Sequence, residues 1–138
     1  MRIAALFDVH GNLPALEAVL AETRITPDES VAAELAGVAA AVVVCGHTHV
    51  QYDRRVVGCP RLVNAGSVGL PYEEVAVAFW ALLGPGVDLR LTAYDPARAV
   101  ARLQASGFPG FDEVFARPLE GGVAAEEATA DFESRRGA

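Results

Sequence analysis

The sequence contains no lysine, so all of its 11 basic residues are arginines, and its formal net charge is −7. An acidic chain lacks the positive field with which nucleic-acid-binding proteins hold phosphates, so nucleic acid is not an expected partner. Cysteine is also scarce. Cys45 and Cys59 are the only two and do not form a CxxC motif. We therefore expect two free thiols rather than a disulfide.

Long uncharged apolar runs are absent as well. The longest nearly apolar stretches are residues 31–45, which Glu34 interrupts, and residues 75–83. Neither reaches the roughly 18 uncharged residues of a membrane span. The apolar stretch before Asp8 is too short for a secretory signal peptide. We therefore expect a cytoplasmic protein that has no membrane partner.

The length and the hydrophobic content favour one folded domain. The chain has 138 residues, 52% of them hydrophobic, which is enough for a core without disulfides or structural metals. We expect a single domain over residues 1–116 and an acidic tail or helix over residues 117–138. Apolar strands and helical patterns alternate in the first half, and hairpins follow in the second. This order predicts the α/β (α+β) class.

The expected elements follow from periodicity and from turn residues. Thr26 and Glu29 match a capping box, with Pro27 in the first helical position between them. Asp95 and Pro96 mark another helix start. The predicted strands cover residues 2–7, 40–45, 52–57, 61–64, 75–83 and 89–94, and the predicted helices cover residues 13–22, 26–36, 95–106 and 124–136.

All three histidines of the sequence follow predicted strands. His10 comes two residues after Asp8, behind the first strand, and His47 and His49 directly follow the strand over residues 40–45. In extended backbone, residues i and i+2 point to the same side. Each segment is therefore expected to present two metal-binding side chains in one direction. Imidazole and carboxylate ligands together suit Zn, Mn, Fe, Co or Ni better than Mg or Ca.

Three segments resemble a known family. Residues 8–20 resemble the opening motif of calcineurin-like metallophosphoesterases, especially of their small bacterial and archaeal phosphodiesterase branch. Residues 46–49 resemble the closing GHTH motif of that family. Residues 64–69 resemble the NPGSVG stretch that follows it, with Ala65 where proline is common. The resemblance implies a two-sheet β-sandwich flanked by helices, with metals bound at the ends of the strands.

The same resemblance implies a hydrolase. In this family a metal-activated hydroxide attacks the phosphorus of a phosphodiester or phosphomonoester, so a phosphate ester is the expected substrate. Carried over to this chain, Asp8, His10 and His49 would be ligands of the first metal, and His47 would be a ligand of the second. No side chain is assigned as the catalytic group itself. Supporting contacts or substrate contacts are expected from three further residues, Asn12, Asn64 and Ser67.

The central motifs of the family are missing. The sequence has no Gly-Asp dipeptide for the metal-bridging aspartate, and its only asparagines, Asn12 and Asn64, do not lie in a GNHD/E motif. These motifs would fall before Thr26, and the gap corresponds to about two strand–helix units. Two divalent ions (Mn, Fe, Zn, Ni or Co) are expected for the family, but only one or none for this chain alone.

Several alternatives are open at this point. One is that an internal stretch is missing from the sequence, which would separate chain neighbours within residues 22–28 by more than the usual ~3.8 Å between Cα atoms. A shortened descendant, or a homo-oligomer whose second chain supplies elements, would also explain the gap. For the function, the alternative to a phosphoesterase is a catalytically impaired metal-binding remnant that acts as a structural or interaction module. A further alternative is a histidine-triad nucleotidyl transferase, because residues 47–51 resemble the HxHxQ stretch of that class.

Overall fold

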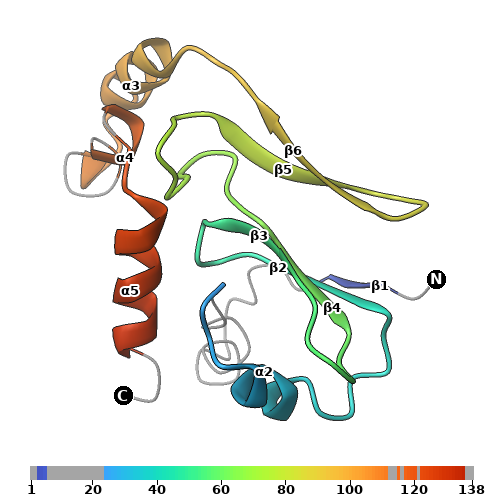
Figure 1. Ribbon diagram of the computed structural model, residues 1–138. Coiled ribbons are helices and arrows are strands. Elements are labelled where there is room, and N and C mark those ends of the chain that lie inside the picture. The colour runs from blue at the N-terminus through green and yellow to red at the C-terminus, as the bar shows by residue number, and fades with distance from the viewer. Residues whose placement is uncertain (1–2, 6–23, 112–114, 116, 121, 136–138) are drawn as a thin grey trace.

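The structure is a computed structural model that describes residues 3–5, 24–111, 115, 117–120 and 122–135. The expected helix over residues 13–22 and part of the junction at residues 22–28 lie outside these ranges. The described elements are β1 (Ile3–Ala5), α2 (Asp28–Glu34), β2 (Val42–Cys45), β3 (Gln51–Arg54), β4 (Arg61–Ala65), β5 (Ala78–Leu83), β6 (Val87–Thr92), α3 (Pro96–Ala105), α4 (Arg117–Glu120) and α5 (Ala125–Arg135) (Figure 1).

Two sheets organise the molecule. The first has the order β1-β2-β4-β3, in which β1, β2 and β4 are parallel and β3 is antiparallel to β4. The second is the antiparallel hairpin of β5 and β6. Both hairpins that the turn residues predict, β3–β4 and β5–β6, are therefore confirmed. The mixed α/β class predicted from the order of the elements is confirmed as well.

The strand β2 lies in the centre of the core, and each of its four residues is buried. Val43 and Cys45 belong to one apolar cluster with Val31 of α2, and Val42 and Val44 belong to another that packs against β6. Helix α2 thus covers one face of the first sheet, and the β5–β6 hairpin covers the other (Figure 1). A strand buried on both faces needs a continuous apolar run, which explains its valines.

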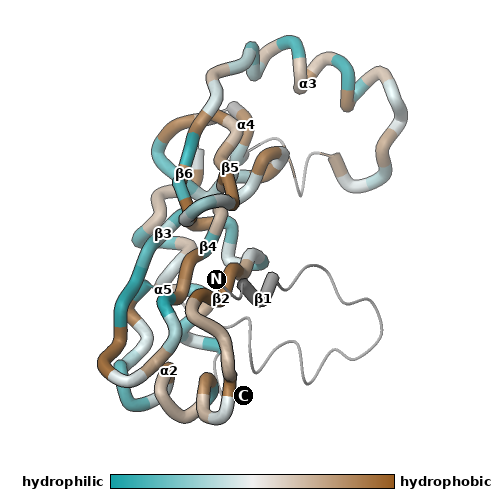
Figure 2. Tube along the Cα trace, turned by 90° about the vertical axis from the view of Figure 1, so that its right-hand side faces the viewer, coloured by the Kyte–Doolittle hydropathy of each residue, from teal (hydrophilic) through white to brown (hydrophobic). Residues whose placement is uncertain are grey.

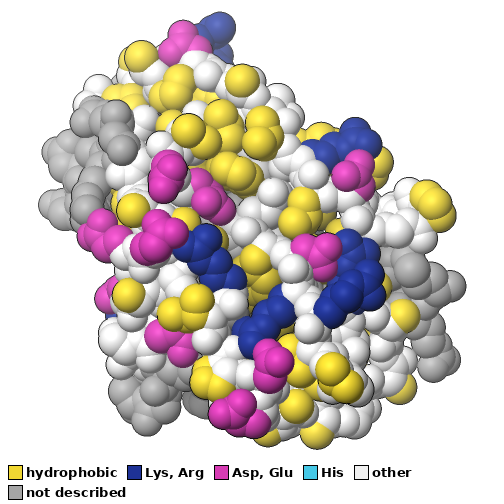
Figure 3. Space-filling view, viewed as in Figure 1, with side chains coloured by type: hydrophobic (Ala, Val, Ile, Leu, Met, Phe, Trp, Pro, Cys, Tyr) yellow, Lys and Arg dark blue, Asp and Glu magenta, His cyan; other side chains and the backbone are white. Residues whose placement is uncertain are grey.

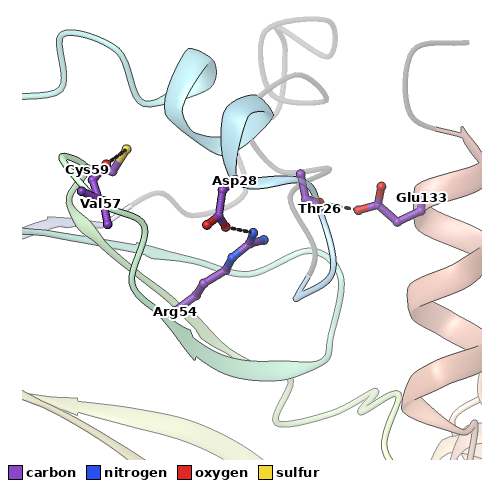
Figure 4. A network of polar contacts seen from close by, with 6 residues as sticks. All are labelled: Thr26, Asp28, Arg54, Val57, Cys59 and Glu133. Carbon is purple, nitrogen blue, oxygen red and sulfur yellow. Dashed lines mark hydrogen bonds and ion pairs between the residues drawn. The ribbon is translucent and has the colours of Figure 1, made fainter.

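The two helices with predicted caps behave differently. In α3 the Asp95 side chain accepts a hydrogen bond from the Arg98 backbone N–H at 3.0 Å, as predicted. In α2 the capping box is wrong, because no side chain caps the helix. The Thr26 hydroxyl instead donates a hydrogen bond to the Glu133 carboxylate of α5 (Figure 4). Thr26 is fully buried by this long-range contact, which a local pattern cannot show.

The C-terminal segment is tied to the rest of the chain. Ala125 and Ala128 of α5 form a small core with Val50, and Arg24 pairs with Glu126 at 2.7 Å. Helix α3 packs separately, with Val100 in an apolar cluster that includes residues from α4. Its alternating hydrophilic and hydrophobic positions are visible in Figure 2. None of the helices in the described ranges is long and apolar enough to cross a membrane.

The side chain of Gln51 joins the two sheets. Its amide nitrogen lies 3.1 Å from the carbonyl oxygen of Ala65, 3.2 Å from that of Trp80 and 3.1 Å from that of Arg90. The backbone N–H of Gln51 donates to the Glu73 carboxylate at 2.8 Å. Gln51 is the last residue of the HxHxQ stretch. In this structure its side-chain amide and its backbone N–H both make hydrogen bonds that stabilise the fold.

Arginines on the face of Figure 3 lie beside acidic side chains rather than in a continuous basic patch. In one such pair, Arg61 donates from Nε and Nη2 to the two carboxylate oxygens of Asp53 at 2.8 and 2.6 Å. The hydrogen bond from Arg61 lowers the pKa of Asp53 below its ordinary value of 3.8. The ion pair therefore stabilises the fold above pH ~4, and this contribution is lost as the pH falls through the folded-state pKa.

Replacing Asp53 with asparagine should lower the free energy of unfolding by ~0.5 kcal/mol at neutral pH, because the pair is bidentate but partly exposed. Urea unfolding of both proteins across a pH series measures the difference. The two stabilities should converge as the pH falls from ~4 through the lowered folded-state pKa of Asp53, because Asp53 is then protonated in both the unfolded and the folded chain. A difference that stays constant to pH ~3 would contradict the role of this ion pair.

Candidate functional site

The candidate site lies at one edge of the first sheet. Residues 46–49, called the histidine loop below, directly follow β2, and β1 and β4 run parallel to β2 on either side. The carboxyl ends of these three strands therefore meet at the same edge, which is where open α/β sheets bind ligands. Asp8 and His10 follow β1 in the sequence but lie outside the described residues, as does Asn12.

The backbone of the histidine loop is not extended. His47 has φ 67° and His49 has φ 56°, so both are in the left-handed region. The expectation that an extended backbone aligns these two side chains is therefore wrong. The physical reason is the buried Thr48 between them, whose backbone N–H bonds to the Gly46 carbonyl at 2.8 Å and closes a tight turn. Left-handed non-glycine residues are strained, and such strain is concentrated at functional sites.

Asn64 holds this turn in place. It is fully buried at the end of β4. Its side-chain nitrogen donates to the Gly46 carbonyl at 2.8 Å and to the Thr48 hydroxyl at 2.9 Å. Its side-chain oxygen accepts from the Gly66 N–H at 2.9 Å. Of the two roles expected for Asn64, the geometry therefore supports the positioning of the histidine loop.

Ser67 shapes the next loop in a similar way. Its hydroxyl accepts a hydrogen bond from the Leu70 backbone N–H at 3.0 Å. Its carbonyl accepts from the Phe79 N–H at 3.0 Å, which ties the loop to β5.

Arg54, which follows the histidine loop in the sequence, forms an ion pair with Asp28 of α2 at 2.5 Å (Figure 4). Cys45 and Cys59 are free thiols, as predicted.

Two aromatic residues that the sequence did not indicate lie against the histidines. The Phe132 ring of α5 meets the His47 ring edge-on at a centroid distance of 5.4 Å. The Tyr72 ring lies 4.9 Å from the His49 ring, and the Tyr72 backbone N–H donates to the His49 carbonyl at 3.1 Å. Burial raises the pKa of the Tyr72 hydroxyl, so it is protonated at neutral pH.

A cavity of about 470 Å³ adjoins this aromatic pair. Tyr72 and Phe132 form part of its wall, and Glu127, Asp131 and Arg135 of α5 add charged groups. Arg135 bonds to Asp131 at 2.5 Å. The cavity therefore combines aromatic surface with hydrogen-bonding groups. Its two aromatic rings contact the imidazoles, which do not line the cavity themselves. No local signal in the sequence predicted this, because the segment reads as an acidic tail.

Two of the four candidate metal ligands, His47 and His49, are among the described residues. His47 and His49 are suitable nitrogen ligands for a transition metal. Within the described ranges, however, no group of three or more His, Cys, Asp or Glu residues is arranged to hold an ion. Three protein ligands are the usual minimum for a catalytic zinc site. A complete site therefore requires donors other than those the described residues provide.

The comparison with solved structures identifies the fold. The chain is similar to a crystal structure of a metallophosphoesterase from Sphaerobacter thermophilus, with a TM-score of 0.55 and 21% sequence identity. The chain has a partial metallophosphoesterase-like fold. The alignment covers 70% of this chain and 48% of that one, so this chain spans about half the length of its structural neighbour. No protein-family model and no curated protein matches the sequence.

The metallophosphoesterase-like fold accounts for the arrangement described above. It has the expected two sheets and flanking helices, and the histidine loop lies at an edge where strands end. The fold similarity and the resemblance of the sequence motifs concern the same family of proteins. At 21% identity the similarity concerns the fold, and the chemistry of the site has to be argued from its own residues.

Proposed function

We propose that this chain belongs to a metal-dependent phosphoesterase that hydrolyses a phosphodiester or a phosphomonoester. The observation that supports this most strongly is the histidine loop. Two histidines with strained left-handed backbone lie at the end of the central strand of a metallophosphoesterase-like fold. The neighbouring parallel strand β1 leads into Asp8 and His10. In the sequence, all three histidines therefore follow one of two adjacent parallel strands.

In this proposal Asp8, His10 and His49 hold a first divalent ion, and His47 takes part in a second site. The ligand types suit Mn, Fe, Zn, Ni or Co. When bound, such ions provide a nucleophile at neutral pH and neutralise charge that develops on the phosphoryl group. A phosphate ester is the substrate partner, and the net charge of −7 disfavours nucleic acid.

The described residues contribute positioning and shape. Asn64 fixes the turn that carries both imidazoles, so that their orientation does not have to be established when a ligand binds. Tyr72 and Phe132 hold the imidazole rings from the side of α5. The adjoining cavity offers apolar and polar surface for the organic part of an ester.

A specific observation favours a second candidate function. The chain aligns with 48% of the neighbouring metallophosphoesterase, and its described residues contain no three-ligand group. A module that binds one ion without turnover would fit these two facts. The central motifs of the family would then be absent from the functional protein, and the domain would act as a structural or interaction module.

Measurements of metal binding and of phosphodiester hydrolysis distinguish the two candidate functions. We expect calorimetry with Mn²⁺ and Zn²⁺ to show binding that weakens at least about tenfold in His49→Ala, which removes one of the few ligands. The matched control is Glu34→Gln, because this carboxylate is exposed on α2, away from the histidine loop. Hydrolysis of bis(p-nitrophenyl) phosphate that EDTA abolishes would support the phosphoesterase.

Each other outcome has a defined meaning. Binding of one ion without hydrolysis would support the non-catalytic module. Hydrolysis that survives EDTA would contradict both candidates and favour a histidine nucleophile, as in the histidine-triad class. Loss of binding in Glu34→Gln to the same extent as in His49→Ala would contradict the proposed ligands.

A further inference from the structure

The β5–β6 hairpin forms the second sheet without any other strand among the described residues. A two-stranded sheet is marginally stable by itself, and an open strand edge is a template for pairing with another chain. The hairpin contacts the first sheet through β5, which packs on β4, and through Val87 and Leu89 of β6, which pack against Val42, Val44 and Val63. The Val87 carbonyl also accepts a hydrogen bond from Arg61 at 3.4 Å. In Figure 1, β6 lies on the far side of β5 from the first sheet. Among the described residues no strand pairs with the edge of β6 that faces away from β5.

The sequence of β6 is Val-Asp-Leu-Arg-Leu-Thr, without proline or glycine. Its side chains alternate between the two faces of the strand. Val87 and Leu89 pack against the core on the inner face. Leu91 lies on the same face but is 61% exposed. Asp88 and Arg90 are on the outer face, both exposed, and pair with each other at 2.7 Å.

Charge decides which self-pairing of β6 is favourable. Two copies related by a two-fold axis perpendicular to the sheet run antiparallel and keep their inner faces on one side. If the axis passes through Asp88, the Asp88 carboxylates of the two copies lie opposite each other. If it passes through Arg90, the two Arg90 guanidinium groups lie opposite each other. If the axis passes Leu89, Asp88 lies opposite Arg90 of the second copy, and symmetry repeats the pair. Opposite charges across strands stabilise and like charges destabilise.

The same register covers apolar surface. With the axis at Leu89, Val87 lies opposite Leu91 of the second copy, and the two Leu89 residues are neighbours. The exposed Leu91 then gains a cross-strand partner on the inner face. The two hairpins become one four-stranded sheet, which removes the open edge of β6 from both copies.

We propose that the β6 edge is a docking surface for a second copy of this chain, paired antiparallel about Leu89. The interface is small because it consists of one strand edge, so the dimer forms reversibly and depends on protein concentration. Its central ion pairs are exposed, so salt weakens it. The proposed dimer involves no metal and no residue of the histidine loop. Its test is therefore independent of the test of the proposed function.

Sedimentation velocity with the full chain tests the dimer. Between about 5 and 200 µM protein we expect a monomer–dimer equilibrium, with weaker association at about 500 mM salt than at about 50 mM. Arg90→Asp places two carboxylates opposite each other across the interface, and Asp88→Arg places two guanidinium groups there. Each single variant should weaken the dimer at least about tenfold. Arg98→Asp on α3 makes the same charge change at an exposed position and should have no effect.

The register is tested by combining the two changes. In the double variant D88R/R90D the two charges have exchanged places, so each guanidinium again lies opposite a carboxylate of the second copy and the dimer should return. A register centred on residue 88 or 90 would leave like charges opposed in this variant. Circular dichroism of each variant shows whether the fold is retained.

Three outcomes would overturn the proposal. These are a monomer throughout the concentration range, a dimer that Arg90→Asp leaves intact, or a double variant that stays monomeric while folded. Slow hydrogen exchange, in a monomer, of those β6 amides that do not face β5 would show that another segment covers this edge.

Discussion

Replacing Asn64 by alanine is expected to lower the free energy of unfolding by ~3 kcal/mol. The side chain is fully buried and makes three hydrogen bonds, to the Gly46 carbonyl, the Thr48 hydroxyl and the Gly66 N–H. Truncation removes these bonds from the buried Thr48 hydroxyl and from the partly buried Gly46 and Gly66 backbone groups. Each polar group that is left unsatisfied costs about 1–3 kcal/mol. Relaxation of the loop and entry of water reduce the sum to the stated value.

Urea unfolding measures the loss, and Thr48→Val is the matched comparison. This variant keeps the volume of the buried side chain and removes one acceptor of the Asn64 amide, so we expect a loss of ~1 kcal/mol. Because the two residues are in contact, their effects should be less than additive in the double variant. If Asn64→Ala changed stability no more than Thr48→Val, the central position of Asn64 in this network would be refuted.

The effect should extend to the candidate site. Asn64 holds the turn that places His47 and His49 in left-handed backbone. Without the amide, the turn loses two of the hydrogen bonds that hold this conformation, and the loop should relax. Metal binding in folded Asn64→Ala is therefore expected to weaken about tenfold or more, although Asn64 itself is not a proposed ligand.

Replacing Gly66 by alanine is expected to cost ~3 kcal/mol. Its φ of 76° lies in the left-handed region, which costs other L-residues roughly 1–2 kcal/mol. A Cβ at this position would lie 2.7 Å from the Phe79 Cβ and 3.2 Å from the Gln51 Cβ. Both neighbours belong to strands, so the clash cannot be relieved by rotation of a flexible side chain. Overpacking of this kind costs a further 1–3 kcal/mol or so.

Gly69→Ala is the control for this variant. Gly69 lies in the same loop, but a Cβ there would meet no atom within 4 Å. We expect a change within ~0.5 kcal/mol in either direction. Thermal unfolding of both variants beside the parent chain provides the measurement. Equal stabilities of the two variants would mean that β4 and β5 are not as close at Gly66 as the structure shows.

Local patterns predicted the elements with strong end signals. The two hairpins and helix α3 are found where turn residues and the Asp95-Pro96 start place them. The α2 cap was predicted on the same kind of signal and is wrong, because Thr26 bonds to Glu133, more than a hundred residues further on. The extended geometry assumed for His47 and His49 is wrong for a similar reason. Thr48 closes a turn within the loop, and Asn64 of β4 holds that turn from outside it.

The sequence by itself determined where strands and turns lie, which residues are candidate metal ligands, and the alternating charges of β6. These properties depend on neighbours in the chain, whose spacing sets the face and the conformation of each residue. Only the tertiary structure decided that Tyr72 and Phe132 lie against the histidines, that α5 packs on Val50, and that Gln51 joins the sheets. Such contacts join segments far apart in the chain, and the packing of whole elements selects them, which no local periodicity encodes.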